Sequence, residues 1–233
     1  MKNKLIFVIC AVLLISTIAS NFSVSAMSNV NVGASSNDKY EVEFIENTKE
    51  YQKIKFTNKE TGDVEFLEAF YSDGSSNYLS TYTDEETKQE MQVVITTENN
   101  ELTIHNLTTD EETTESIIDI KEANSIQPFG LPGGYGDYVL QATFRGSKQI
   151  VDSAVGIVSV IAGIVASIFG GPVTGIVTTI AMYLASAGAV KFYYVHELYY
   201  WRDIPVYPAY FVKYYENSNY TGFIDMVWHT TVN

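Results

Sequence analysis

Few residues of this chain combine the types and spacing that catalysis or metal binding requires. His196-Glu197 begins like a zinc-protease motif, but the motif needs a second histidine at position 200, where Tyr200 stands. The other two histidines, His105 and His229, show no spacing typical of metal ligands. No serine lies in a Gly-x-Ser-x-Gly turn, and no glycine-rich phosphate loop is followed by the lysine it requires. The sequence therefore predicts a protein that is not an enzyme and that uses no cofactor or metal ion.

An uncharged segment of 38 residues, 153–190, indicates a different kind of function. Gly170-Gly171-Pro172 interrupts it near its middle and favours a turn, because proline cannot continue the helix before it. Two apolar arms of roughly 17 residues flank this turn, each about 25 Å long as a helix. We expect a helical hairpin whose arms are slightly shorter than the roughly 30 Å hydrocarbon core of a bilayer.

Small residues recur at every fourth position along both arms, which lets helix backbones approach closely, as they do inside membranes. A charge at the centre of an inserting helix is costly, so a charge at position 163 or 166 is expected to abolish membrane activity. Two alternatives stay open: the hairpin is the buried core of a soluble domain, or it is a permanent anchor. The residues expected to insert are Gly156, Gly163, Ala166, Gly170, Gly171, Pro172, Gly175, Ala181 and Ala185.

The segment that follows the hairpin is rich in aromatic residues, with 14 among the 37 positions of 192–228. Tyrosine and tryptophan favour the membrane–water interface, where an apolar ring and a polar tip are both satisfied. We therefore expect Tyr193, Tyr194, Tyr200, Trp201 and Trp228 to lie at such an interface. Two alternatives are a surface that binds other molecules, including cell-wall sugars, and a β-rich core.

The N-terminus is typical of a secretory signal peptide. Lys2 and Lys4 precede an apolar core over residues 5–18, and small residues allow cleavage after Ala26. An uncleaved membrane anchor is the alternative. Cys10 lies within the apolar core, so the exported chain is expected to have no cysteine and no disulfide. These features favour a secreted protein of a bacterium, in particular a Gram-positive one.

The charge is distributed unevenly between two parts of the chain. The formal net charge is −14; residues 27–130 hold 7 Lys and Arg against 22 Asp and Glu (−15), whereas residues 131–233 hold 5 against 6 (−1). The absence of a basic patch that could neutralise phosphates excludes nucleic acid as a partner. The acidic part is either a solvated surface that keeps the protein soluble, or a prodomain that keeps the second part soluble and inactive.

Alternating apolar and polar residues predict short strands at 40–45, 51–57, 64–70, 91–97 and 101–107, as in an antiparallel meander with one solvated face. Further strands are expected at 138–145, 210–215 and 220–228. The predicted fold is α+β: a β meander, then a central apolar helical hairpin and an aromatic β-rich C-terminal part. Its parts are a signal peptide (1–26), an acidic propeptide-like domain (27–122), a Gly- and Pro-rich linker (123–136) and the hairpin domain (137–233). Ala26 and Gly134, in the linker, are the expected processing sites.

The order of a signal peptide, an acidic propeptide-like half and a Gly- and Ala-rich apolar hairpin resembles the large, heat-labile secreted bacteriocins of Gram-positive bacteria, of the geobacillin type. The segment 153–190 also resembles, in kind, the hydrophobic hairpin of pore-forming colicins. The resemblance implies killing of related bacteria by membrane permeabilisation. This chain lacks the strong positive charge of small bacteriocins, which favours a receptor or a cell-wall component as its first contact.

We therefore expect a secreted, bacteriocin-like antimicrobial precursor that acts on the membrane of a target cell, where it forms a homo-oligomer. A second hypothesis is a secreted, non-enzymatic binding or cell-surface module whose apolar helices form its core. A third is an immunity protein that the hairpin anchors in the envelope of the producing cell.

Overall fold

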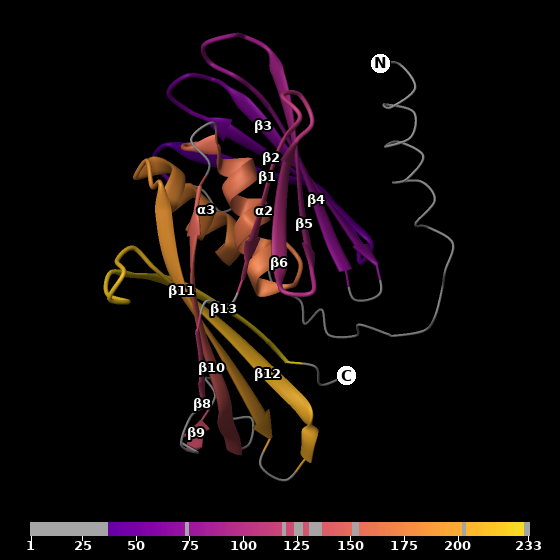
Figure 1. The fold of residues 1–233 in the computed structure, drawn as a ribbon. Helices are drawn as coiled ribbons and strands as arrows, with labels where there is room; N and C mark the ends of the chain where they lie inside the picture. Colours follow the sequence, from indigo (N-terminus) through magenta and orange to yellow (C-terminus); the bar gives the residue numbers. More distant parts are fainter. Residues whose placement is uncertain are drawn as a thin grey trace.

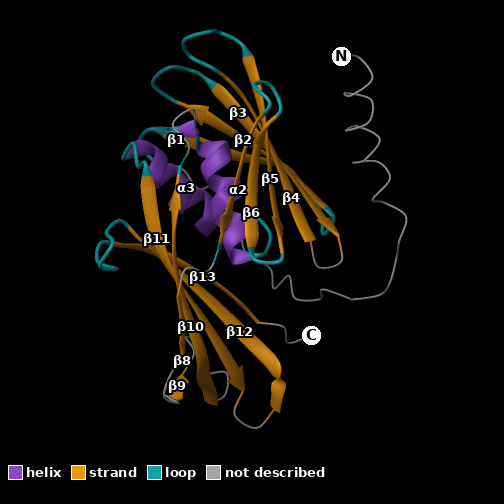
Figure 2. Ribbon diagram, in the orientation of Figure 1, coloured by secondary structure: helices purple, strands orange, loops and turns teal. Residues whose placement is uncertain are grey.

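The computed structural model describes residues 37–72, 75–117, 120–123, 128–130, 137–150, 154–201 and 204–230. These residues form two antiparallel sheets with two helices between them (Figures 1 and 2). The predicted α+β fold, with its β meander followed by apolar helices and aromatic strands, is confirmed. The predicted signal peptide and both expected processing sites, Ala26 and Gly134, lie outside the described residues.

The first sheet, sheet A, is a meander in which seven strands pair in chain order. Its strands alternate: in the second, Gln52, Ile54 and Phe56 point inward and are buried, whereas Lys53 and Lys55 are partly exposed. The outer face carries ion pairs, such as Lys53 with Glu68 at 3.1 Å. The strands are β1 (Tyr40–Asn47), β2 (Tyr51–Asn58), β3 (Val64–Ser72), β4 (Ser75–Thr83), β5 (Glu90–Glu98), β6 (Glu101–Asn106) and β7 (Glu111–Ser116).

The second sheet, sheet B, has the order β13-β12-β11-β10-β8, and β9 pairs with β10 beside β8. Strand β8 comes from the end of the predicted propeptide-like domain and β9 from the predicted linker, so sheet B includes strands from before the hairpin domain. Its strands are β8 (Ile120–Ala123), β9 (Pro128–Gly130), β10 (Asp137–Gln149), β11 (Lys191–Trp201), β12 (Ile204–Tyr215) and β13 (Phe223–Thr230).

The two helices are α2 (Val158–Phe169) and α3 (Gly175–Ser186), and the predicted turn separates them. Gly170 ends α2 with a φ of 74°, a left-handed conformation that glycine adopts without steric cost, and its N–H donates to the carbonyl of Ala166. Pro172 follows and prevents the helix from continuing. Each helix has 12 residues, fewer than the arms expected from the sequence, because residues beside the turn and at the outer ends are not helical.

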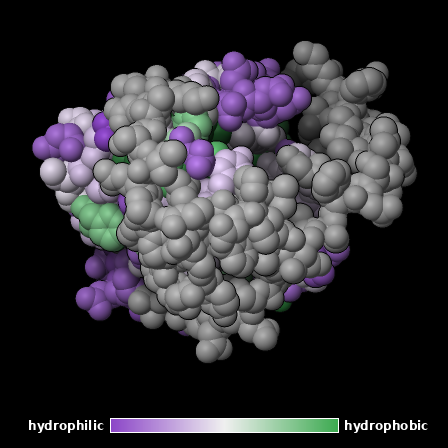
Figure 3. Space-filling view, turned by 90° about the horizontal axis from the view of Figure 1, so that it is seen from below, coloured by the Kyte–Doolittle hydropathy of each residue, from purple (hydrophilic) through white to green (hydrophobic). Residues whose placement is uncertain are grey.

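One hydrophobic core joins the two sheets through the helices. It contains inward residues of sheet A, such as Ile54 and Leu67, and residues of sheet B, such as Phe192 and Tyr214. A smaller cluster of Tyr199, Ala209 and Phe211 lies apart from it, within sheet B. Seen from below, the coloured surface shows small hydrophobic areas separated by hydrophilic ones (Figure 3).

Candidate functional site

Helix α2 is the most enclosed element of the described chain. All of its 12 residues are buried, and none carries a charge. It packs against β3, β4 and β5 of sheet A, against β12 of sheet B and against α3. A helix that is apolar on every side is stable only in a protein interior or in a membrane. The expected membrane-inserting segment is thus sheathed by sheet A, which we call the sheath.

The N-terminal end of α2 is held by polar side chains of the sheath. Its N-cap position, Ile157, provides no side-chain hydrogen bond, and the N–H of Ser159 donates instead to Oε2 of Glu65 on β3, at 2.7 Å. The hydroxyl of Ser80 on β4 lies 2.6 Å from that of Ser159, and both side chains are buried. A carboxylate at a helix N-terminus satisfies free N–H groups and interacts favourably with the helix dipole.

Burial raises the pKa of Glu65 above its ordinary value, because the charged form loses its hydration. The hydrogen bonds from Ser159 and the nearby charge of Asp63 act in opposite directions, the first lowering the pKa and the second raising it. Glu65, whose carboxylate caps α2, is therefore more easily protonated than an exposed glutamate.

The turn of the hairpin is held by a second set of polar contacts. The N–H of Val173 donates to Oε1 of Gln52 at 2.9 Å, and Nε2 of Gln52 donates to the carbonyl of Val173 at 3.2 Å. The hydroxyl of Tyr71 donates to the same Oε1 at 2.6 Å and lies 3.1 Å from the N–H of Val173. The hydroxyl of Tyr78 donates to the carbonyl of Gly171 at 2.8 Å. The sheath thus binds the backbone of the hairpin at both ends of α2.

Sheet B contributes one buried polar contact to α2. The hydroxyl of Tyr214 donates to the carbonyl of Val165 at 2.9 Å, and burial raises the pKa of Tyr214 well above its ordinary value. Tyr194 is also buried, and its hydroxyl donates to the carbonyl of Ile117 at the end of sheet A. These tyrosines are packing residues with satisfied hydroxyls.

The structure brings the predicted hairpin residues together, but inside the protein. Gly163, Ala166, Ala181 and Ala185 are buried. A Cβ at Gly163 would lie 2.5 Å from Cδ1 of Ile95, which shows how closely α2 approaches the sheath. A charge at position 163 or 166 would therefore disrupt the fold as well as insertion, so the loss of activity expected from the sequence would not distinguish the two. The remaining positions lie outside the helices or at their ends: Gly156, Gly171, Pro172 and Gly175 are partly exposed and Gly170 is exposed.

The aromatic residues expected at an interface are distributed between interior and surface. Trp228 is 44% exposed, whereas Tyr193 and Tyr200 are partly exposed. Tyr194, only 1% exposed, is interior in this fold because its position on β11 points toward the helices. The side chain of Trp201 lies outside the described residues.

The incomplete zinc-protease motif, His196-Glu197, lies on β11 of sheet B. His196 and Glu197 are neighbours on β11, so their side chains project to opposite faces of sheet B. Burial lowers the pKa of His196 to about 4, which makes it neutral. Glu197 is paired with Lys213 at 2.7 Å and accepts from the hydroxyl of Tyr199 at 2.8 Å. Glu197 thus forms an ion pair on one face of sheet B, and the neutral His196 lies on the other face.

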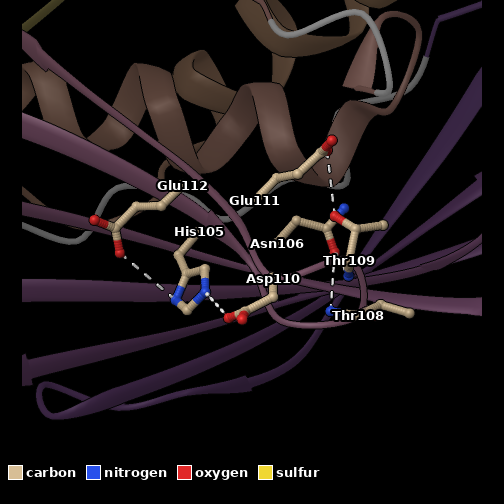
Figure 4. A network of polar contacts seen from close by, with 7 residues as sticks. All are labelled: His105, Asn106, Thr108, Thr109, Asp110, Glu111 and Glu112. Carbon is tan, nitrogen blue, oxygen red and sulfur yellow. Dashed lines mark hydrogen bonds and ion pairs between the residues drawn. The ribbon is translucent and has the colours of Figure 1, made fainter.

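A second polar group surrounds His105 at the turn between β6 and β7 (Figure 4). Its Nε2 lies 3.4 Å from Asp110 and its Nδ1 lies 3.9 Å from Glu112. Asn106 shapes the turn, since its Oδ1 accepts the N–H groups of Thr108 and Thr109. These contacts stabilise a turn; no group of three potential metal ligands occurs among the described residues.

The residues that hold the hairpin were not predicted from the sequence. One signal was present: Gln52 shares the inward face of β2 with Ile54 and Phe56, and a polar residue on such a face requires a buried partner. Ser80 stands between Tyr78 and Tyr82 on the inward face of β4 in the same way. The partner of each could not be deduced, because it lies about 80 to 120 residues further along the chain.

Comparison with known protein families, with curated proteins and with solved structures gives no match for this chain. Within the described residues, neither helix has the length and apolarity needed to cross a membrane. The fold and the contacts around α2 therefore carry the functional argument.

Proposed function

We propose that this chain is a secreted, bacteriocin-like protein that stores a membrane-active hairpin inside a β-sheath and permeabilises target membranes when the hairpin is released. The observation that supports this proposal is the complete burial of the uncharged helix α2 against sheet A, which forms hydrogen bonds with the backbone at the start of α2 and in the turn after it. As a helix of about 18 Å, α2 is too short to span a bilayer of normal thickness, so insertion is oblique or thins the bilayer. Cleavage in the segment 123–136 is the proposed release step.

A disulfide between sheath and hairpin tests the proposal directly. Ser80 and Ser159 are buried with their hydroxyl oxygens 2.6 Å apart, so Ser80→Cys with Ser159→Cys places two thiols in position to form a bond. Dye leakage from liposomes is measured with the exported chain, intact and after limited proteolysis in 123–136. We expect the oxidised double variant to be inactive and the reduced one to regain the leakage of the wild type.

The matched control is Thr103→Cys with Thr114→Cys, whose hydroxyl oxygens lie 3.0 Å apart within sheet A. This pair links β6 to β7 and leaves the hairpin free, so oxidation should not change leakage. Equal leakage from the oxidised and reduced Ser80–Ser159 variants would contradict release from the sheath. Intact-mass analysis of the secreted protein shows independently whether the segment 123–136 is cut.

A second function, a non-enzymatic binding or surface module, is favoured by a different observation. The single core shared by sheet A, the helices and sheet B is what a permanently folded module requires. This function predicts a full-length secreted protein that causes no leakage in any redox state. The wild-type leakage assay separates the two functions.

A further inference from the structure

The outer strands of the two sheets differ in how well they are protected against pairing with another chain. Strand β1 carries exposed Glu43 and Glu46 and has a register shift between Phe44 and Glu46. Strand β7 is exposed at all six positions, and three of them are glutamates. On the far side of sheet B, β8 has only four residues. Charges, irregular register and short length are the usual means by which proteins block edge-to-edge association.

Strand β13 has a register shift of its own, beside Ile224, but it lacks the multiple charges of β1 and β7 and is twice as long as β8. It has eight residues, pairs with β12, and has no second neighbour among the described strands. Phe223 is 58% exposed and Trp228 is 44% exposed. Asp225 is its only Asp, Glu, Lys or Arg, and Oδ1 of Asp225 accepts the N–H of Met226 at 2.8 Å.

Helix α3 adds apolar surface beside this strand. It contacts β13, and Tyr183 donates a hydrogen bond to Glu216 in the turn that leads into β13. Its exposed positions include Ile176, at 37%, and Tyr183, at 43%. Four of the seven exposed large hydrophobic residues of the described chain thus come from α3 and β13. They lie on both sides of the β13 edge: Val227 faces the core with the helices, whereas the ring of the adjacent Trp228 stacks on Phe211 on the other face of sheet B. Exposed apolar residues on both sides of a free strand edge favour a partner that covers this edge.

We propose that the free edge of β13, with the exposed side of α3, is a dimer interface that binds a second copy of this chain. The strand can pair with itself. In an antiparallel register centred on Val227, the Val227 residues of the two copies face each other, and Met226 of each copy faces Trp228 of the other. The same register sets Asp225 across from position 229, a histidine, so that no like charges are opposed. A two-fold axis then joins two six-stranded sheets into one.

Charge favours this pairing over association through sheet A. Residues 131–233 carry a formal charge of only −1, whereas residues 27–130 carry −15 and their edges would repel each other. The dimer does not depend on the proposed membrane activity, because it forms from the folded, uncleaved chain.

The test is the mass in solution of the exported full-length chain, by light scattering and by sedimentation over a range of concentrations. We expect a dimer, and we expect Trp228→Lys and Tyr183→Lys each to weaken it about tenfold or more, because the first puts a lysine on the pairing edge and the second puts a charge in the apolar surface of α3. Tyr183→Lys retains a partner in Glu216, so it keeps the fold if Trp228→Lys does not. Circular dichroism checks folding in both.

Ile45→Lys is the matched control, because Ile45 is 49% exposed on β1, an edge of the other sheet. This variant should dimerise like the wild type. A chain that is monomeric at every concentration overturns the proposal. A dimer that survives both Trp228→Lys and Tyr183→Lys, or that Ile45→Lys abolishes, overturns it equally.

Discussion

The contact between Gln52 and the hairpin turn should dominate the attachment of the hairpin to the sheath. Gln52 is 2% exposed and makes four hydrogen bonds. Two join it to the N–H and the carbonyl of Val173, one accepts the hydroxyl of Tyr71, and one, from Nε2, reaches Oδ1 of Asn47 at 2.7 Å. Gln52→Leu removes all four with a side chain of similar size.

The cost follows from the groups that lose their partners. In this variant the N–H of Val173 still donates to the Tyr71 oxygen, at 3.1 Å. The carbonyl of Val173 loses its donor, and the hydroxyl of Tyr71 loses its acceptor. Each buried polar group without a partner costs about 1–3 kcal/mol. Burial of the leucine side chain offsets about 1 kcal/mol of this. We therefore expect Gln52→Leu to lower the free energy of unfolding by about 1–5 kcal/mol.

Urea unfolding of the exported chain measures this change, and a double-mutant cycle with Tyr71→Phe locates it. Tyr71→Phe should cost about 1 kcal/mol alone. Its cost should differ in the Gln52→Leu background, because Gln52 and Tyr71 bind each other and share the N–H of Val173. Gln92→Leu is the control, since Gln92 is partly exposed on β5 and should change stability by less than about 0.5 kcal/mol. A loss below about 0.5 kcal/mol in Gln52→Leu, or full additivity with Tyr71→Phe, would refute the reasoning.

Two other contacts of α2 give predictions of a different kind. Burial raises the native pKa of Glu65 above its ordinary value of 4.5. Between pH 4.5 and the native pKa, the native state holds a proton that the unfolded state has released. The wild type should therefore lose stability as the pH rises through this range. Glu65→Gln should remove this decline, which urea unfolding at a series of pH values measures; an unchanged slope would disprove the assignment. Gly163→Ala should lower stability by about 1–2 kcal/mol, because its Cβ would lie 2.5 Å from Cδ1 of Ile95. Ile95→Val removes that methyl group, so the double variant should regain part of the loss in thermal unfolding, and no recovery would mean that the clash is not the cause.

The strands that the sequence predicted are those whose inward positions are regularly apolar. Strand β2, with Gln52, Ile54 and Phe56 inside, was expected at 51–57 and extends over Tyr51–Asn58. Strand β4 was missed, since it is rich in serine and threonine and buries Ser80 between two tyrosines. Strand β7 was missed because all of its residues are exposed, which leaves no alternation to detect. Both strands are defined by pairing with the neighbouring strands of the meander, and the apolar pattern of their own residues does not reveal it.

The shared core of the two halves could not be predicted from charge. Most acidic residues of sheet A lie on its outer face, whereas its inner face is mainly apolar: Ile54, Phe56, Leu67 and Ile95 are fully buried. Net charge therefore reflects the outer face of sheet A. It gave no information on what the inner face of sheet A covers.

Composition does not predict whether α2 lies in a protein core or in a bilayer, because a helix that is apolar on every side is stable in both environments. The polar residues of the sheath distinguish the two. Apolar side chains alone would be enough to pack sheet A against a helix. Glu65, Ser80 and Gln52 nevertheless form hydrogen bonds with α2 or with the turn that follows it. A bilayer offers no such partners to the sheath, so release would leave these buried groups unsatisfied and cost several kcal/mol. On the proposed function, detachment of sheet A lets water satisfy these polar groups, and insertion of the hairpin into the bilayer must offset the loss of the apolar core.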